Sequence, residues 1–285
     1  MSALLLLPSL LLLGLVSVLL AFAPTISRAL CRSGGLVRPN FRGNLIPAST
    51  GLTFLLILMP VYAALLFWPL FRRDAALYLL VVTSFGLLGL ADDRWGSRTV
   101  GGFRGHLRSL LTPHPTTGAL KLVGGGGVAL IASAVVHAPV SRSLVVLLLF
   151  FADALLIALC ANALNLLDLR PGRAQFGFAL LLLPSLLTAF LHQEPQGILP
   201  FGAGIAALRE WRADSRADTM MGDTGSNLLG AAAGLSAVLF LPLGGRLLLL
   251  VLVIALNTAS ERFSLTRLIA ESPVLNSLDR LLGAR

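Results

Sequence analysis

Hydrophobic residues along this chain fall into long runs that are separated by short polar segments. A transmembrane helix needs about 20 consecutive, mostly apolar residues, and most of the runs approach that length. Because two of the runs are shorter, we expect about nine spans, with a range of about 8–10. The predicted spans cover residues 2–26, 48–70, 76–91, 118–136, 144–165, 175–191, 196–208, 226–242 and 247–259. The pattern predicts an all-α, polytopic transmembrane helical bundle.

The polar connections are too short to form a separate aqueous domain. The longest runs from Asp92 to Thr117, so we expect a single integral membrane unit covering residues 1–285. No positive residue precedes the first run and no small-residue cleavage pattern ends it, so we expect a retained first helix rather than a signal peptide. Cys31 falls in a predicted loop and Cys160 in a predicted span, so we expect no disulfide between them.

Composition supports the membrane interpretation. Of the 285 residues, 56% are hydrophobic and 12% are charged, and the mean hydropathy is +0.87. A soluble domain of this length could not bury that much apolar surface and still cover itself with polar groups. Lipid is therefore expected to solvate much of the chain.

The net charge of +9 raises the question of nucleic-acid binding, but the basic residues are dispersed over short loops. The loops after the first, third, fifth and seventh spans and the C-terminal tail hold 18 of the 22 basic residues. The positive-inside rule then places the N-terminus outside and the C-terminus in the cytoplasm, with Arg72-Arg73 as a local contradiction. We expect no nucleic-acid partner, and we interpret the charge as a topology signal that also attracts anionic lipid.

Most carboxylates follow the same partition, which the insertion rule does not require: 10 of the 13 acidic residues lie on the predicted cytoplasmic face. Asp153 sits inside the fifth span, about 22 Å from Asp168 along a helix, so we expect it to be structural or protonated. Glu210, Asp214 and Asp218 are interpreted as loop charges offset by neighbouring arginines. The remaining carboxylates at helix ends suggest a site that is open to the cytoplasm.

Asp92 and Asp93 end an apolar helix in the sequence GLADDRWG. Negative charge is unfavourable at a helix C-terminus, so a carboxylate pair there is costly unless a cation or a proton offsets it. One interpretation is a solvated helix end with Arg94 and Arg98 as partners. The other is a base or a metal-binding pair at the membrane surface.

Asn162, Asn165 and Asp168 are spaced three residues apart at the cytoplasmic end of the fifth span, so they should share one helix face. Polar groups on an apolar helix are expected to point into the bundle rather than towards lipid. They would serve either a binding site or hydrogen bonding between helices.

Asp223 lies in MGDTGS, between Gly222 and Gly225, where the eighth span begins. Glycines allow the backbone to approach a ligand closely, a helix N-terminus favours phosphate, and a carboxylate could hold Mg²⁺ against that phosphate. The alternative is a plain helix cap.

Lys121, the only lysine among the basic residues, begins the fourth span. A topology anchor could be arginine, as elsewhere in this chain, so a compact ammonium directed at a phosphate is one interpretation. Snorkelling of the side chain to the membrane surface is the other. None of the four histidines forms a metal-ligand pattern.

Together, GLADDRWG, NALNLLDLRPG and MGDTGS resemble, in order, the motifs of the polyprenyl-phosphate N-acetylhexosamine-1-phosphate transferase family. This family includes phospho-N-acetylmuramoyl-pentapeptide transferase and the GlcNAc-1-phosphate transferases. The resemblance implies Mg²⁺-dependent transfer of a sugar-1-phosphate from a UDP-sugar to a polyprenyl phosphate. UMP would be released, in glycan synthesis at the cytoplasmic face of the plasma membrane. A homodimer is a further expectation.

The resemblance also implies roles for individual residues. Asp223 would bind Mg²⁺, Asp92 and Asp93 would engage or deprotonate the lipid phosphate, and Asn162, Asn165, Asp168 and Lys121 would contribute to substrate binding. Two features depart from the family: Pro171 replaces the second aspartate of the DGxDG motif, and the histidine-rich motif is missing. Arg170, Arg173, Arg262 and Arg267 are candidate replacement cations. The alternatives are a non-catalytic relative that binds a lipid-linked sugar or a partner protein, and a transporter.

Overall fold

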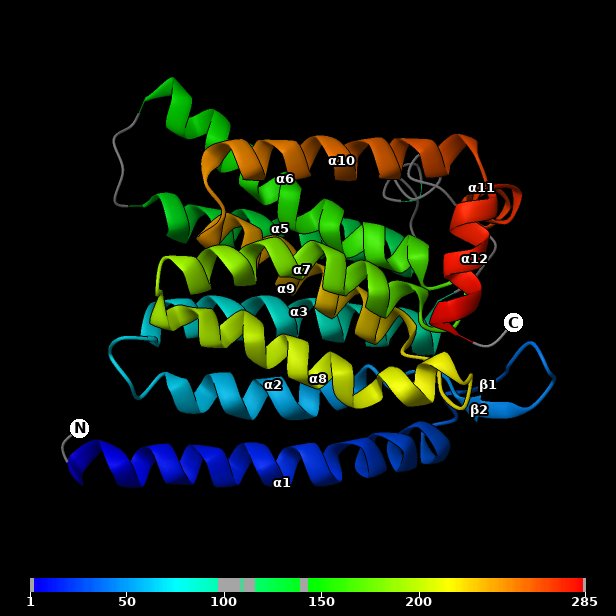
Figure 1. Cartoon of the computed structure of the whole chain (residues 1–285), viewed down its shortest axis with the longest axis horizontal. Helices are drawn as coiled ribbons and strands as arrows, with labels where there is room; N and C mark the ends of the chain where they lie inside the picture. Colours follow the sequence, from blue (N-terminus) through cyan, green and yellow to red (C-terminus); the bar gives the residue numbers. More distant parts are fainter. Residues whose placement is uncertain (1–2, 97–108, 110–115, 139–142, 284–285) are drawn as a thin grey trace.

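The computed structural model describes residues 3–96, 109, 116–138 and 143–283. Its long elements are helices that run roughly parallel and antiparallel to one another along the long axis of the molecule (Figure 1). The strands in this part of the chain form one antiparallel hairpin, in which Val37 pairs with Pro47 and Pro39 with Leu45. The elements are α1 (Ala3–Ser33), β1 (Val37–Pro39), β2 (Leu45–Pro47), α2 (Leu52–Leu65), α3 (Arg72–Trp95), α5 (Thr117–His137), α6 (Leu144–Leu167), α7 (Arg173–Leu191), the 3-10 helix η1 (Pro195–Gly197), α8 (Ile198–Ser215), α9 (Gly222–Phe240), α10 (Leu243–Arg262), α11 (Leu265–Glu271) and α12 (Pro273–Leu282).

Each predicted apolar segment coincides with one of the helices α1 to α3 and α5 to α10. Among the described residues, six of these are long and apolar enough to cross a membrane: α1, α3, α5, α6, α7 and α10. The prediction of an all-α helical membrane protein is therefore confirmed at this level. The number of spans and their orientation stay predictions. The hairpin is an element that the hydrophobic pattern did not predict.

Helix α9 lies at the centre of the bundle and packs against α3, α6 and α7 (Figure 1). Every residue from Thr224 to Val238 is buried. Small residues allow this close packing: a Cβ at Gly230 would lie 2.4 Å from the carbonyl oxygen of Cys160, and one at Gly234 would lie 2.7 Å from the Cα of Ile157. Because protein rather than lipid surrounds α9, this helix does not need the high hydropathy of the outer helices.

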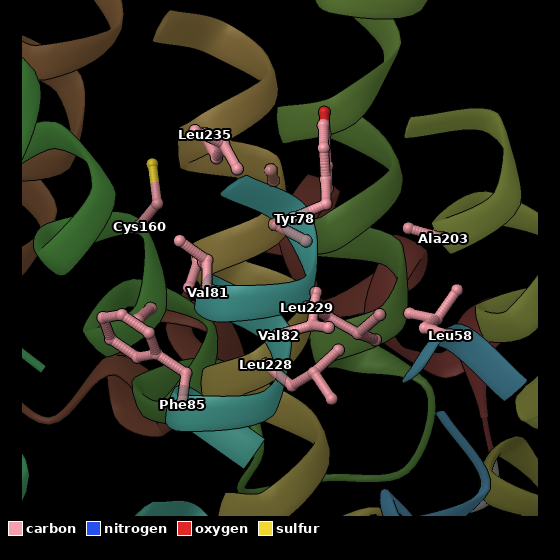
Figure 2. Close-up of a cluster of buried hydrophobic side chains, with 14 of the residues drawn as sticks. Leu58, Tyr78, Val81, Val82, Phe85, Cys160, Ala203, Leu228, Leu229 and Leu235 are labelled. Atoms are coloured by element: carbon pink, nitrogen blue, oxygen red, sulfur yellow. The ribbon is translucent and has the colours of Figure 1, made fainter. Parts of the chain in front are cut away.

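Larger side chains from α3 fill the space beside α9. Figure 2 shows Tyr78, Val81, Val82 and Phe85 on α3 near Leu228, Leu229 and Leu235 on α9. The polar atom of Tyr78 is satisfied, since its hydroxyl forms a 2.7 Å hydrogen bond with Ser236. This packing fixes α3 against α9 and so determines where their ends meet.

Candidate functional site

The last turn of α3 and the first turns of α5 and α9 meet at one end of the bundle. This is the end that also carries the hairpin and α12 (Figure 1). Asp92 and Asp93 come from α3, Lys121 from α5 and Asp223 from α9. The structure thus brings together four residues from three segments that lie far apart in the sequence.

Lys121 bridges two of the carboxylates. Its Nζ lies 3.0 Å from Oδ2 of Asp92 and also donates to Oδ2 of Asp223. Thr117, one turn earlier on α5, donates its hydroxyl to Oδ1 of Asp92. The exposed fractions of the Lys121, Asp92 and Asp223 side chains are 17%, 21% and 28%, so the three side chains are partly accessible to solvent. Burial raises the pKa of Asp223 to about 7, against the opposing effect of Lys121.

Asp93 has different partners from Asp92. Its Oδ1 accepts the backbone N–H of Asp223 at 2.9 Å, and its Oδ2 accepts the backbone N–H of Thr224 at 3.0 Å. Oδ2 also accepts the hydroxyl of Thr224 at 2.6 Å and that of Ser49 at 2.5 Å. Asp93 therefore caps the N-terminus of α9 from another helix, which satisfies backbone donors that would otherwise lack partners. From the sequence, Arg94 and Arg98 were candidate partners of the two aspartates. Arg94 instead donates to the carbonyl of Gly34 at 2.7 Å, and Arg98 lies outside the described residues.

The glycines of MGDTGS are explained by contacts within the protein. Gly222 has a φ of +69°, and a Cβ there would lie 2.7 Å from Oδ2 of Asp93. A Cβ on Gly51 would lie 2.1 Å from the backbone nitrogen of Gly225. The segment before α2 is joined to the segment before α9 by backbone hydrogen bonds, including Gly51 N–H to the carbonyl of Met221 at 2.9 Å. These close contacts hold Asp223 in place beside Lys121.

The spacing of Asn162, Asn165 and Asp168 had predicted one common polar face. In the structure the three side chains have separate surroundings. Asn162 is exposed and donates to Oδ1 of Asn257 on α10 at 2.6 Å, which corresponds to the helix–helix interpretation. Asn165 accepts the Ser226 hydroxyl at 3.2 Å, next to the start of α9. Only Asn165 and Asp168 therefore approach the Asp223 region.

Asp168 ends α6 in a strongly acidic environment. Burial raises the pKa of its carboxyl well above the usual range, and the nearby charges of Asp214, Asp223 and Asp93 raise it further. A carboxylate surrounded by others of the same sign favours a bound cation or a proton.

Asp214 and Glu210 are buried within α8, so the prediction that they are loop charges is wrong. Asp214 accepts the backbone N–H of Gly172 at 2.8 Å, and burial raises its pKa to about 6. Glu210 pairs with Arg28 at 3.3 Å and accepts the Thr53 hydroxyl at 3.2 Å. Both residues continue the buried face of α8, on which Ala203, Ala206 and Ala207 also lie. Their helical spacing was the signal that could have revealed this.

Two of the candidate replacement cations already have partners. Arg173 is buried and binds Asp279 of α12 through two contacts of 2.9 and 3.0 Å. Arg267 pairs with Glu271 at the surface. Arg170 and Arg262 are exposed. Arg173 therefore ties α12 to α7, and Arg267 pairs within α11.

Asp153 lies towards the other end of the molecule, as its distance from Asp168 had predicted. Its Oδ2 is 2.6 Å from Nη1 of Arg246 and 2.9 Å from Nε2 of His137. The ion pair with Arg246 and the hydrogen bond with His137 join α5, α6 and α10 and account for the carboxylate without a role in the site. The two cysteines are buried and unbridged.

Oxygen ligands of the kind that Mg²⁺ prefers are present beside Lys121. Within the described residues, no three His, Cys, Asp or Glu side chains converge as a complete metal cage. Mg²⁺ is usually held by one or two carboxylates, with water and substrate phosphates as its other ligands. The carboxylates of Asp92 and Asp223 match that number of protein ligands, and Asp223 lies at the N-terminus of α9.

A scan against protein-family models gave no match for this chain, and a search of curated proteins gave none either.

Proposed function

We propose that this protein transfers a sugar-1-phosphate from a UDP-sugar to a polyprenyl phosphate at the cytoplasmic face of the plasma membrane, with release of UMP. The observation that carries the proposal is the contact of Lys121 with both Asp92 and Asp223 at a partly exposed meeting point of three helix ends. Phosphoryl transfer needs chiefly positioning and charge neutralisation. A site at the end of a membrane bundle can receive a lipid acceptor and a soluble donor together.

The proposed roles divide among the residues by their contacts. Asp223, with Asp92 beside it, would hold Mg²⁺, and the ion would neutralise charge on the donor's phosphates. Lys121 would then turn its ammonium to a phosphate oxygen, since a cation would take over its contacts with the carboxylates. Asp92 would keep the hydrogen bond from Thr117, which would hold its carboxylate in place beside the acceptor phosphate.

Asp93 receives a positioning role in this proposal. Both of its oxygens are taken up by the start of α9 and by Ser49, so it holds the Asp223 backbone rather than the acceptor. Asn165 and Asp168 approach the same helix start from α6 and would face the nucleotide.

An exchange assay on the purified full-length protein tests the proposal. With UDP-GlcNAc, undecaprenyl phosphate and Mg²⁺, labelled UMP should enter the sugar nucleotide. Asp223→Asn should lower the rate by at least about 100-fold, the loss typical of a removed charge-stabilising group. The matched control is Glu271→Gln, because Glu271 is exposed and pairs with Arg267 at the surface.

Exchange that survives in Asp223→Asn would refute the assigned metal ligand. Absence of exchange with a panel of UDP-sugars would refute the transferase activity. It would favour the non-catalytic relative that binds a lipid-linked sugar or a partner protein. Thermal unfolding of each variant distinguishes a lost ligand from a lost fold.

A further inference from the structure

The short helix α12 lies across one end of the bundle, roughly at a right angle to α10 (Figure 1). Helix α10 is one of the helices that are long and apolar enough to cross a membrane. Its 20 residues reach about 30 Å, the thickness of the hydrocarbon core. The seven-residue helix α11 then joins α10 to α12. A helix that crosses the end of a span in this way runs parallel to the membrane surface, where acyl chains meet headgroups.

One side of α12 is fixed to the bundle. Asp279 is 8% exposed, and its carboxylate binds Arg173 at the start of α7 through contacts of 2.9 and 3.0 Å. At the C-terminal end of α12, the carbonyl oxygen of Leu282 would lie 2.3 Å from a Cβ on Gly172. These contacts determine which sides of α12 remain free.

A second side of α12 is apolar and exposed. Val274, Leu278 and Leu281 are spaced four and three residues apart, so they share one helix face. Their exposed fractions are 77%, 38% and 84%. On another side, the polar residues Ser277 and Arg280 are exposed. Separate apolar and polar sides are typical of a helix that lies in the membrane interface, with its apolar side towards the acyl chains.

Exposed apolar residues connect this face of α12 to the surface of α10. Helix α10 buries only Val253, so most of its surface is free to meet lipid. Phe263, directly after α10, is 58% exposed, and Leu268 on α11 is 42% exposed. The apolar face of α12 therefore continues the apolar surface of a candidate membrane span.

Lipid matches the apolar face of α12 better than a protein partner does. A standard protein–protein interface uses about 20–30 residues on each side, whereas this face consists of three side chains. Transfer of apolar surface from water into an apolar environment is favourable in proportion to its area, so a narrow face suffices for lipid. We propose that α12 is an interfacial helix that inserts Val274, Leu278 and Leu281 among the lipid acyl chains, next to the headgroups.

Spin labels on the purified full-length protein, in nanodiscs of phosphatidylcholine and phosphatidylglycerol, test this proposal. Electron paramagnetic resonance compares the collisions of each label with O₂, which concentrates in lipid, and with a water-soluble nickel chelate. Labels on Val274→Cys and Leu281→Cys should collide more with O₂, at a depth of about 5–10 Å into the boundary between headgroups and acyl chains. The matched control Ser277→Cys lies on the polar side of the same helix and should collide more with the nickel chelate.

Val274 and Leu281 are largely exposed, so both variants should fold, which thermal unfolding checks. The native Cys31 and Cys160 are 0% exposed and should stay unlabelled. Nickel collisions as frequent on the apolar face as at Ser277→Cys would place that face in water and overturn the proposal. Rare collisions with both reagents would show a protein cover and would also overturn it, and dipolar broadening between labels would identify that protein as a second copy.

Discussion

At the scale of single residues, Asp92 and Asp93 show how adjacent carboxylates separate in space. Consecutive residues on an α-helix point about 100° apart, so Asp92 faces Lys121 on α5 while Asp93 faces Thr224 on α9. The sequence identified both as candidates from the cost of charge at a helix end. It could not assign their different partners, because these depend on which helices pack on either side of α3.

Lys121→Met tests the ion bridge, since the substitution keeps an unbranched side chain that is one atom shorter and removes its charge. Asp92 and Asp223 would then face each other without a counter-ion, which should destabilise the fold by about 2 kcal/mol. If the carboxylates bind Mg²⁺, adding the ion should raise the Tm of the variant more than that of the wild type. Arg267→Met is the matched control, because its partner Glu271 is 58% exposed and the pair should contribute under about 1 kcal/mol. Equal responses to Mg²⁺ would argue against a metal at this pair.

Asp168→Asn is expected to stabilise the fold while it lowers exchange activity. The pKa of Asp168 is raised in the folded state, so ionisation of this group opposes folding. The protonated carboxyl of Asp168 favours the folded state, and this contribution to stability is fully present below the ordinary pKa of about 4. It is lost as the pH rises towards the raised pKa of the folded state. The variant should therefore have a higher Tm than the wild type at about pH 8, and the difference should vanish at about pH 4. A lower Tm at both pH values would refute the electrostatic explanation.

At the scale of elements, hydrophobic runs predicted where helices lie but not where they end. Helix α8 continues beyond its apolar part to Ser215, and its last turns bury Glu210 and Asp214. A polar sequence after an apolar run resembles a loop unless the partners, here Arg28 and Gly172, are known. The hairpin escaped prediction because its strands are three residues long, too short for an alternating pattern.

The contact between α3 and α9 can be tested at Gly89. A Cβ there would lie 2.2 Å from the carbonyl oxygen of Asp223. Gly89→Ala should therefore push the two helices apart, at a cost of about 1–3 kcal/mol, and reduce exchange by displacing Asp223. Gly126→Ala on α5 is the control, because no atom lies within 4 Å of its Cβ position. Measured Tm values should fall for the first variant only, and equal values for the two would contradict the close contact.

At the scale of the whole molecule, the bundle has two chemically different ends. The end that carries the hairpin and α12 (Figure 1) gathers Asp92, Asp223 and Lys121, whereas Asp153 lies towards the other end beside Arg246 and His137. The asymmetry of basic loops predicts which end faces the cytoplasm, but helix packing alone does not fix the orientation. The resemblance to a transferase family predicted a set of site residues, of which Asp92, Asp93, Lys121 and Asp223 lie together while Asn162 contacts Asn257 instead. The chemistry of these residues stays a prediction.

Orientation can be measured with single cysteines at the two ends. The native Cys31 and Cys160 are fully buried, at 0% exposure, so they should contribute little background. A membrane-impermeant maleimide should label Glu194→Cys in intact cells, because this position is exposed at the predicted outer end. It should label Glu271→Cys only after permeabilisation. The reverse pattern would invert the predicted topology and remove the proposed site from the cytoplasm.

The central position of α9 has a consequence for inherited variation. In α10, a helix of 20 residues, only Val253 is buried, whereas α9 is enclosed from Thr224 to Val238. Most exchanges of one aliphatic side chain for another should therefore be silent in α10. In α9, selection should often remove even a substitution that adds a single methyl group. Within this protein, the enclosed helix α9 should therefore evolve more slowly than the exposed helix α10.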